Sequence, residues 1–451
     1  MADIAVLEHF GTLDKAWLEA VDRYLPVRHP PWCFNREIGA DLPGQGWKLH
    51  VSATILTATE VLDRVGQCLA GESVYFKAIE TRDELRKLNC GLFYGYFQIG
   101  KFMTIYPTDA SAVGRIAHKV ATATAGMAGP PVPFELRVEA GSPVFMRYGM
   151  FRPGSGDGAA SLINPDGLPE PDRRDRNPDW AALPVGLPTA RPDRVDGPLA
   201  RRFRVYKCLS QRGKGGVYQA IDVACGMRHC ILKEGRRHGE VDLDGSDGWS
   251  RLDSEYHALC RLSQAGVPVP APIARFEQAG HAYVVMEWLH GEVLGKLLMD
   301  SADLPSTDMA RDLARRSAGL LKQIHAARWA WRDLKSTNLI IGVDGALRPI
   351  DFEGSARFGT PLDTVWGSPG HMPHDVHLTR TAGPEQDLFA LGSLLYQIFT
   401  GKFLADARGA PAKCDVSGLP EPIIRLMNAL WHADPRCRPA AAAVCEALAV
   451  I

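Results

Sequence analysis

The chain has 451 residues, and its 51 Lys and Arg side chains nearly balance its 52 Asp and Glu side chains, giving a formal net charge of -1. At about 150 residues per domain, this length predicts two or three domains. A near-zero net charge gives no indication of binding to nucleic acid or to an anionic membrane, so neither is expected as a partner.

Targeting signals and cysteines restrict the class of protein further. The first residues lack a basic head followed by an apolar run, and the sequence contains no run of about 18 apolar residues that would span a membrane. The 10 Cys residues are scattered, without a CxxC pair or a Cys/His cluster at zinc spacing. The sequence therefore predicts a cytoplasmic protein with no membrane span, no disulfide framework and no zinc.

Residues 1–152 show a mixed α+β pattern. Apolar residues at helical spacing predict helices over 14–24, 59–69 and 112–125. Short runs rich in aromatic and β-branched residues predict strands over 47–54, 74–79, 102–106 and 143–148. We therefore expect a small mixed domain at the start of the chain.

Pro, Gly, Asp and Arg dominate residues 153–200, and the apolar periodicity disappears there. Pro fixes φ and removes a hydrogen-bond donor, while Gly and Asp favour turns, so no regular element is expected. We interpret this stretch as an interdomain linker that docks in part on its neighbours, with Trp180 and Leu183 as candidate anchors.

Residues 201–451 are strand-rich up to about residue 287 and helix-rich after it. This order predicts a small sheet followed by a helical body, with a cleft between the two lobes. The fold class predicted for the whole chain is α+β, with a small mixed domain ahead of a two-lobed one.

Basic side chains recur on the predicted strands of the first domain. Lys48 and His50 lie two residues apart on one strand, so they share a face. Lys77, Lys101 and Arg147 lie on or beside the other strands. Each alone is typical of a side chain that snorkels at a strand edge, but together they favour a convergent anion site, with phosphate as the natural anion.

This set of side chains suits β-elimination of phosphate. Neighbouring cations lower the pKa of a Lys, which lets its amine act as a base near neutral pH. Such a base removes the α-proton of a phosphorylated residue, a His donates a proton to the leaving phosphate, and the remaining cations hold the phosphate charge. The reaction needs no metal and no covalent intermediate.

The second half contains WRDLKSTN at 331–338 and DFE at 351–353, which resemble the catalytic loop and the metal loop of protein kinases. Phosphoryl transfer needs a carboxylate near the attacking hydroxyl, a cation on the transferred phosphate and oxygen ligands for Mg²⁺. The resemblance assigns the carboxylate to Asp333, the cation to Lys335, and the Mg²⁺ ligands to Asn338 and Asp351.

Further kinase elements follow in the family's order. Lys233 ends an apolar strand and resembles the Lys that binds the nucleotide phosphates. Glu255 lies on the apolar face of the next helix, where a carboxylate is costly unless it is paired, and resembles the partner of that Lys. Glu287 lies in a segment that resembles the adenine-binding hinge. The glycines that stand at the phosphate-binding loop are Gly213, Gly215 and Gly216.

The same resemblance extends to the helical body, and it includes departures. Asp387 resembles the residue that braces the catalytic loop, and Arg438 is expected to pair with Asp375. The glycine-rich loop is incomplete. Trp331 replaces the catalytic-loop His, and Glu353 replaces a Gly, which should restrict flipping of the metal loop.

Three strings in the first half resemble the N-terminal lyase domain of class III lanthipeptide synthetases, which is itself similar to phosphothreonine lyases of bacterial effectors. They are LPVRHPPW at 25–32, DLPGQGWKLHVSAT at 41–54 and GKFMTIYP at 100–107. The resemblance implies that Lys77 is the base, His50 the acid and Lys48 the cation that tunes the base, although the division between the two lysines stays open. It gives phosphate binding to Lys101 and Arg147, with Arg137 competing with Arg147.

The resemblance covers a lyase domain over 1–152 and a kinase domain over 201–451, in the family's order. Family members normally continue into a cyclase-like domain, so we expect a form that ends before it, with a separate cyclase or decarboxylase as a partner. The leading hypothesis is a peptide dehydratase that uses Mg²⁺ and ATP, or another nucleoside triphosphate. It phosphorylates Ser or Thr of a precursor peptide with a leader segment, then eliminates the phosphate.

Two other functions remain open. One is a Ser/Thr kinase whose first domain binds phosphopeptides without catalysis, which would leave a stable phosphoproduct. The other is a pseudokinase scaffold, which the incomplete glycine loop and Glu353 motivate.

Overall fold

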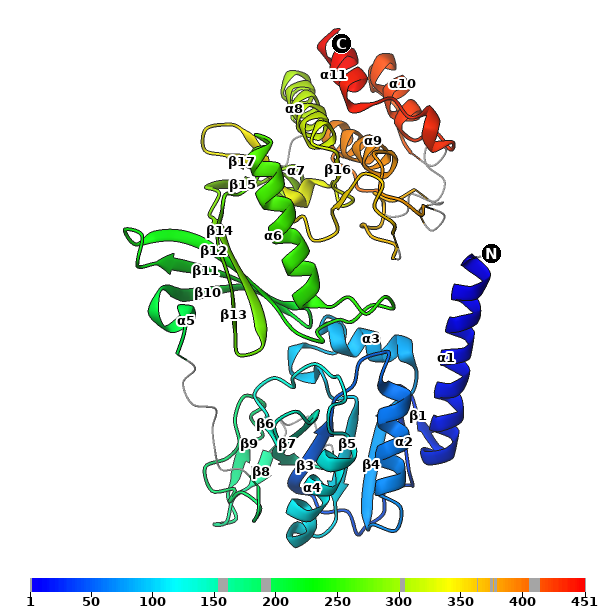
Figure 1. Cartoon of the computed structure of the whole chain (residues 1–451), viewed down its shortest axis with the longest axis vertical. Coiled ribbons are helices and arrows are strands. Elements are labelled where there is room, and N and C mark those ends of the chain that lie inside the picture. The colour runs from blue at the N-terminus through cyan, green and yellow to red at the C-terminus, as the bar shows by residue number, and fades with distance from the viewer. Residues whose placement is uncertain are drawn as a thin grey trace.

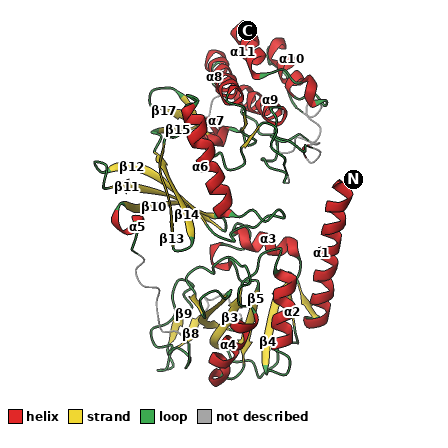
Figure 2. Ribbon diagram, in the orientation of Figure 1, coloured by secondary structure: helices red, strands yellow, loops and turns green. Residues whose placement is uncertain are grey.

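The computed structural model describes residues 2–152, 161–187, 196–300, 305–362, 364–373, 376, 379–404 and 414–450. Figure 1 shows an N-terminal part, residues 2–187, below a C-terminal part, residues 196–450. Each part has its own large sheet and its own hydrophobic core, and Figure 2 shows the strands gathered in these two regions. The α+β class is confirmed.

The N-terminal part is built on a seven-stranded antiparallel sheet with strand order β1-β2-β4-β5-β3-β7-β6. Its strands are β1 (Val27–His29), β2 (Trp32–Phe34), β3 (Gln45–Val51), β4 (Val74–Ile79), β5 (Met103–Pro107), β6 (Leu136–Arg137) and β7 (Val144–Met150). Its helices are α1 (Ala2–Tyr24), α2 (Ala58–Cys68), α3 (Arg82–Cys90) and α4 (Val113–Ala123), with the 3-10 turns η1 (Tyr96–Gln98) and η2 (Ala110–Ala112).

Alternation along β3 separates the two faces of this sheet. Trp47, Leu49 and Val51 join the core cluster together with apolar residues of α2 and α4. The intervening Lys48 and His50 therefore belong to the opposite face, since successive strand residues point to opposite sides. The helices thus cover one face and leave the other to the polar side chains.

The predicted strands and helices of this part are all present, and β4 has the predicted bounds. The first helix begins earlier than predicted, at Ala2. Helix α3 was not predicted. It begins after Thr81, whose hydroxyl accepts a hydrogen bond from the Glu84 amide at 3.1 Å, and it ends at Gly91, whose φ of 76° suits glycine.

Residues 161–187 of the predicted linker pack on the N-terminal sheet. They form the hairpin β8 (Ser161–Ile163) and β9 (Pro169–Pro171). The Trp180 ring lies 5.2 Å from the Tyr148 ring, and Leu183 packs against the core. These are the two anchors expected from the sequence. The stretches 153–160 and 188–195 lie outside the described residues.

The C-terminal part has a small lobe and a large lobe. The small lobe is a five-stranded antiparallel sheet, ordered β10-β11-β12-β14-β13, with helix α6 packed on it. Its elements are α5 (Pro198–Arg201), β10 (Phe203–Arg212), β11 (Gly215–Asp222), β12 (Arg228–Gly235), α6 (Gly248–Gln264), β13 (Pro272–Gln278) and β14 (His281–Glu287).

The large lobe is helical, as the sequence predicts. Its helices are α7 (Leu294–Asp300), α8 (Thr307–Ala326), α9 (Glu385–Thr400), α10 (Glu421–Leu430) and α11 (Ala441–Val450), with 3-10 turns η3 (Ser336–Asn338) and η5 (Pro435–Cys437). Its short strands are β15 (Gly291–Val293), β16 (Trp329–Ala330), β17 (Leu339–Gly342), β18 (Leu347–Pro349) and β19 (Ala356–Arg357). Within the described residues, no helix has the length and apolarity needed to cross a membrane.

Candidate active sites

A cavity of about 320 Å³ lies between the two lobes of the C-terminal part. It contains all the charged or polar residues that the sequence predicts for nucleotide phosphates and Mg²⁺. Its lining includes Lys233, Glu255, Lys335, Asn338 and Asp351. The fold therefore brings residues from both lobes to one place.

Lys233 and Glu255 form the predicted ion pair across β12 and α6. The Lys233 Nζ lies 2.7 Å and 2.9 Å from the two Glu255 carboxylate oxygens and 3.4 Å from Asp351. Burial opposes the charge of Lys233, yet the carboxylates of Asp351 and Glu255 raise its pKa. The Phe352 amide also donates to Glu255 at 3.1 Å, which joins the metal loop to α6.

The catalytic-loop residues form a hydrogen-bonded cluster around Asp333. Its carboxylate accepts from Lys335 Nζ at 2.7 Å, from Asn338 Nδ2 at 2.9 Å and from Ser368 Oγ at 2.8 Å. Lys335 also donates to Ser368 at 2.7 Å. Ser368 had no predicted role, and its hydroxyl bridges Lys335 and Asp333.

Asp387 holds the catalytic loop in place. Its buried carboxylate accepts from the amides of Trp331 at 2.8 Å and Arg332 at 2.6 Å. Arg332 has a φ of 66°, in the left-handed region that is costly for a residue with a Cβ. The two hydrogen bonds offset this strain, so the predicted bracing contact is present. Arg438 donates to the Glu385 carbonyl at 2.8 Å, while its expected partner Asp375 lies outside the described residues.

Trp331 occupies the place of the catalytic-loop His without breaking the loop contacts. Its ring stacks on Phe352, with centroids 5.3 Å apart, and its Nε1 donates to the Asp351 carbonyl at 2.9 Å. It is fully buried. The indole therefore supplies both packing and a hydrogen bond to the metal loop.

The predicted glycine residues differ in position. Gly215 and Gly216 line the cavity between the lobes. Gly215 has a φ of 153°, and a Cβ there would lie 1.7 Å from the Glu234 carbonyl oxygen. Gly213 and Glu287 do not appear in the cavity lining. Gly213 faces the N-terminal part, and the Glu287 carboxylate accepts from the Ala271 amide at 3.2 Å.

Asn338 and Asp351 present oxygen atoms that suit Mg²⁺. The Asn338 amide nitrogen is occupied by Asp333, which leaves its carbonyl oxygen for a cation. Lys233, Lys214 and Lys335 overcome the effect of burial and bring the pKa of Asp351 down to about 2, so this carboxyl is ionised. Hard oxygen donors of this kind match Mg²⁺. Among the described residues, no three His, Cys, Asp or Glu side chains gather as a metal site, and the expectation of no zinc stays a prediction.

The second site lies on the polar face of the N-terminal sheet. Strand register places Phe34 opposite Lys77, Lys77 opposite Thr104, and Thr104 opposite His50. His50 in turn pairs with Phe145, which pairs with Arg137, and Lys48 pairs with Arg147. Directly paired residues in an antiparallel sheet share a face. Five of the six predicted lyase residues, all except Lys101, therefore lie on one face of the sheet. They occupy two neighbouring rungs, a rung being a row of residues paired across the strands.

Lys48 and Lys77 are the two candidate bases, and both have depressed pKa values. Burial, together with the charge of Arg147, lowers the pKa of Lys48 to about 7. Burial lowers the pKa of Lys77 to about 8. The Lys48 Nζ donates to the Met150 carbonyl at 2.8 Å, and the Lys77 Nζ lies 4.0 Å from the centre of the Trp32 ring. Each can exist as a neutral amine near neutral pH.

The pKa values of Lys48 and Lys77 can be tested by titrating the two side chains directly. The Nζ protons of Lys48 and Lys77 should dissociate with midpoints near pH 7 and pH 8, whereas an unfolded Lys titrates near about 10.4. The unfolded chain then binds more protons in this window, so these two groups add stability as pH rises from about 7 to about 10. NMR titration of the Lys Cε resonances, assigned with Lys48→Met and Lys77→Met, measures both midpoints. Midpoints near 10 for both would contradict this environment.

His50 and Lys101 share a buried carboxylate that sequence reasoning missed. The Glu135 side chain is fully buried, with Oε2 2.6 Å from His50 Nδ1 and Oε1 2.9 Å from Lys101 Nζ. Burial opposes its charge, but His50 and Lys101 bring the pKa of the Glu135 carboxyl down to about 2. Burial lowers the pKa of His50 to about 4. A neutral His50 with Nδ1–H donating to Glu135 directs Nε2 away from that carboxylate.

The two arginine candidates for phosphate binding have different partners. Arg147 forms a close ion pair with Asp172 and donates to the Arg173 carbonyl at 2.9 Å. Asp172 belongs to the docked segment 161–187 and also accepts from the Met150 amide at 3.1 Å. The Arg137 guanidinium lies 4.5 Å from the centre of the Phe145 ring. The predicted competition between Arg137 and Arg147 stays open.

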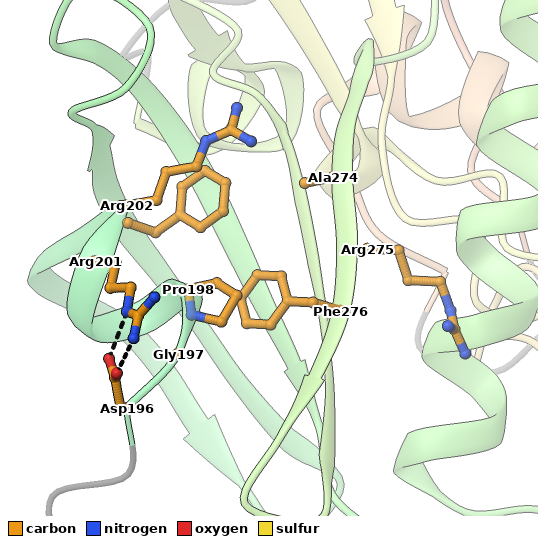
Figure 3. Close-up of a pocket in the computed structure, with 9 residues that line it drawn as sticks. Asp196, Gly197, Pro198, Arg201, Arg202, Ala274, Arg275 and Phe276 are labelled. Carbon is orange, nitrogen blue, oxygen red and sulfur yellow. Dashed lines mark hydrogen bonds and ion pairs between the residues drawn. The ribbon is translucent and has the colours of Figure 1, made fainter.

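Another cavity, of about 610 Å³, lies beside α5 at the edge of the small lobe. Figure 3 shows Arg201 paired with Asp196 at its rim and Arg275 pointing away toward α6. Arg202 is paired with Asp222 at 2.6 Å. Since these arginines already have carboxylate partners, the cavity has little free charge, and we assign it no chemistry.

Comparison with known proteins divides the chain in the same way as the structure. Residues 14–196 match the family described as RamC, N-terminal domain. Residues 213–448 match the family described as protein kinase domain, and this match covers more than half of the chain.

Individual relatives agree with these matches. The chain is 30% identical to a probable SapB synthase of Streptomyces coelicolor over 394 residues, which is 82% of this chain and 41% of that protein. It is 25% identical to a probable serine/threonine-protein kinase PknB of Lactococcus lactis, over 48% of this chain and 34% of that protein. A serine/threonine-protein kinase PknA of Nostoc is 30% identical over 45% of this chain and 38% of that protein. The chain spans less than half the length of these relatives.

Proposed function

Since the chain belongs to the protein kinase family and has a RamC N-terminal domain ahead of its kinase domain, we propose that it is a peptide dehydratase of the lanthipeptide type. The kinase domain phosphorylates Ser or Thr of a ribosomal precursor peptide, using ATP and Mg²⁺. The N-terminal domain then eliminates the phosphate to leave dehydroalanine or dehydrobutyrine. The observation that carries this proposal is the presence of two complementary sites in one chain, one suited to making a phosphoester and one suited to breaking it.

In the kinase step, Asp333 would orient the substrate hydroxyl and accept its proton, while Lys335 balances charge on the transferred phosphoryl group. Lys233 would hold the nucleotide phosphates, positioned by Glu255. Asn338 and Asp351 would hold Mg²⁺, which neutralises phosphate charge when it is bound. The intact Lys233–Glu255 pair and the joined metal loop support an active kinase rather than a pseudokinase scaffold.

In the elimination step, a neutral Lys removes the α-proton of the phosphorylated residue. The Cα–H electron pair forms the Cα–Cβ double bond, and the Cβ–O bond breaks to release phosphate. The negative charge of the bound phosphate would raise the pKa of His50, so that Nε2 takes up a proton from solvent and then gives it to the leaving oxygen. Lys101 and Arg147 would hold the phosphate. The choice between Lys48 and Lys77 as base stays open, with Lys77 favoured by the family resemblance.

Glu135 is expected to be a positioning residue for His50 in this reaction. Glu135→Gln keeps the size of the side chain but removes the charge that orients His50 and neutralises Lys101, and loss of such an orienting carboxylate commonly costs orders of magnitude in rate. We expect phosphate release from a synthetic phosphoserine peptide to fall about 100-fold, with ADP formation unchanged.

A matched control for Glu135 lies on the surface of the same domain. Glu139 pairs with the exposed His118 at 2.5 Å, so Glu139→Gln removes the same kind of pair away from the site. Elimination by Glu139→Gln should equal that of the wild type. Equal rates for both variants would remove Glu135 from the mechanism.

The direct test of the proposed function is the fate of an unmodified precursor peptide incubated with the full chain, ATP and Mg²⁺. A dehydratase gives net loss of water at Ser or Thr. The competing function, a Ser/Thr kinase with a phosphopeptide-binding N-terminal domain, gives a stable phosphopeptide.

A further inference from the structure

The glycine-rich loop of the kinase domain touches the N-terminal domain. The Gly213 amide, at the tip between β10 and β11, donates to the carbonyl of Cys90 at 3.0 Å, and Cys90 is the last residue of α3. A Cβ on Gly213 would lie 1.7 Å from the Asn89 carbonyl oxygen. Gly213 does not have a positive φ. The neighbouring helix, and not the backbone conformation, therefore excludes a side chain here.

Arg236 ties the same loop to the N-terminal domain a second time. Its amide donates to the Lys214 carbonyl at 2.8 Å, and its guanidinium donates to the Arg212 carbonyl at 3.0 Å. Arg236 thus holds the residues on both sides of Gly213. The same guanidinium lies 5.2 Å from the centre of the Tyr96 ring in η1. A cation over an aromatic face at this distance is attractive.

The end of α3 is itself fixed to the candidate lyase site. The Asn89 side chain donates to the Ala53 carbonyl at 2.9 Å and accepts from the Gly100 amide at 3.2 Å. Gly100 directly precedes Lys101. Asn89 is buried, so the helix end is a rigid support rather than a loose contact.

The position of the glycine-rich loop determines where the Lys214 side chain lies. Lys214 lines the cavity between the lobes together with Lys233 and Lys335, and it forms a close ion pair with Glu353. Glu353 also lies 3.8 Å from Arg251 of α6. The residue that replaces the metal-loop glycine therefore holds a glycine-loop lysine at the place expected for nucleotide phosphates.

We propose that the end of α3 and Tyr96 position the glycine-rich loop of the kinase domain, so that tight nucleotide binding through Lys214 depends on the N-terminal domain. The proposal rests on the proposed function only in taking a nucleoside triphosphate as the ligand of the kinase cavity. Asn89, Cys90 and Tyr96 act here as positioning residues, since they touch neither the cavity nor the reacting groups. The N-terminal domain thereby serves the kinase step as well as its own.

Gly213→Ala in the full chain tests the first contact. The added Cβ must push the loop away from α3, and the lost hydrogen bond and displaced Lys214 should raise the Kd of Mg²⁺–ATP, measured by calorimetry, about tenfold. The matched control is Gly319→Ala in α8, where an added Cβ meets no atom within 4 Å. It should leave the Kd within about twofold.

Tyr96→Ala tests the second contact from outside the kinase domain. Loss of the contact with Arg236 should raise the Kd of Mg²⁺–ATP about threefold and raise KM for ATP more than it lowers kcat. Phe97→Ala is the control: it removes a neighbouring ring whose ring contacts, with Tyr96 and Phe134, lie within the N-terminal domain, so the Kd should stay within about twofold of the wild-type value. Elimination from a synthetic phosphoserine peptide should be unchanged in Gly213→Ala and Tyr96→Ala, which shows that the N-terminal domain is folded in both variants, and an unchanged thermal unfolding profile shows the same for the kinase domain.

Two results separate this inference from the proposed function. If Gly213→Ala and Tyr96→Ala both bind Mg²⁺–ATP as tightly as the wild type, the positioning role is wrong, whatever the peptide product. If the Kd values rise as expected but the wild type never dehydrates a peptide, the positioning role stands and the dehydratase assignment fails.

Discussion

Asp333→Asn should reduce phosphorylation of a Ser/Thr peptide by about 1,000-fold while leaving elimination from a synthetic phosphoserine peptide at the wild-type rate. Asn keeps the shape of the side chain but removes the negative charge that orients and deprotonates the substrate hydroxyl. The loss should be large because Lys335, Asn338 and Ser368 all make hydrogen bonds to this one carboxylate.

Phosphorylation is measured as peptide-dependent ADP formation, and elimination as release of inorganic phosphate. Asp344→Asn is a suitable control, since Asp344 pairs with Arg348 at the surface of the large lobe. An Asp333→Asn variant with normal ADP formation would remove Asp333 from the kinase step. Loss of elimination as well would mean that the substitution damages the whole chain.

Most of the kinase site could be predicted because its chemistry fixes local strings of sequence. Asp333, Lys335 and Asn338 lie within one short loop, so their identities and spacing alone indicate the cluster that the structure shows. Gly213 is different. Its place in a glycine-rich string predicted that it would lie at the nucleotide phosphates. In the structure, the side of Gly213 where a Cβ would stand faces Asn89 of the N-terminal domain. No local pattern predicts a contact between segments so far apart in the chain.

His50→Ala and Lys77→Ala should each convert the enzyme from a dehydratase into a kinase that accumulates phosphopeptide. Elimination should fall about 100-fold to 10,000-fold, because each variant loses a proton-transfer group. Peptide-dependent ADP formation should continue. The register of the sheet supports this pairing of roles, since Lys77, Thr104 and His50 occupy adjacent positions on one rung.

Surface residues of the same domain give matched controls. His118→Ala and Lys119→Ala remove a His and a Lys from α4, where both pair with exposed or partly exposed carboxylates. These variants should dehydrate peptide normally. If Lys77→Ala still eliminates phosphate at the wild-type rate and Lys48→Ala does not, Lys48 is the base and the division of roles taken from the family is reversed.

The sequence predicts the strands of the candidate lyase site, but not the carboxylates Glu135 and Asp172 that complete it. Lys48 and His50 alternate with apolar residues along β3, and that period of two is visible without a structure. Glu135 lies just before a strand of two residues, β6, and 85 positions away from His50. Asp172 lies in a Pro-rich segment that resembled a linker. Neither residue belongs to a periodic segment, and only the folded chain shows that both complete the charge balance of the site.

Helix α3 was also missed from the sequence, although the residues at its two ends are recognisable signals. Thr81 followed three residues later by Glu84, and Gly91 at the other end, are start and stop signals for a helix. Its short apolar face, formed by Leu85 and Leu88, gives too little periodicity on its own. The helix matters beyond the fold, because its last turn supports the glycine-rich loop of the kinase domain.

We propose that this one chain both makes and eliminates the phosphoester. The most direct measurement is mass spectrometry of a leader-bearing Ser/Thr precursor peptide after incubation with the wild-type chain, ATP and Mg²⁺, with samples taken until ATP consumption stops. We expect transient phosphopeptide followed by net loss of one water for each modified residue. A wild-type product that keeps its phosphate to the end would contradict this proposal.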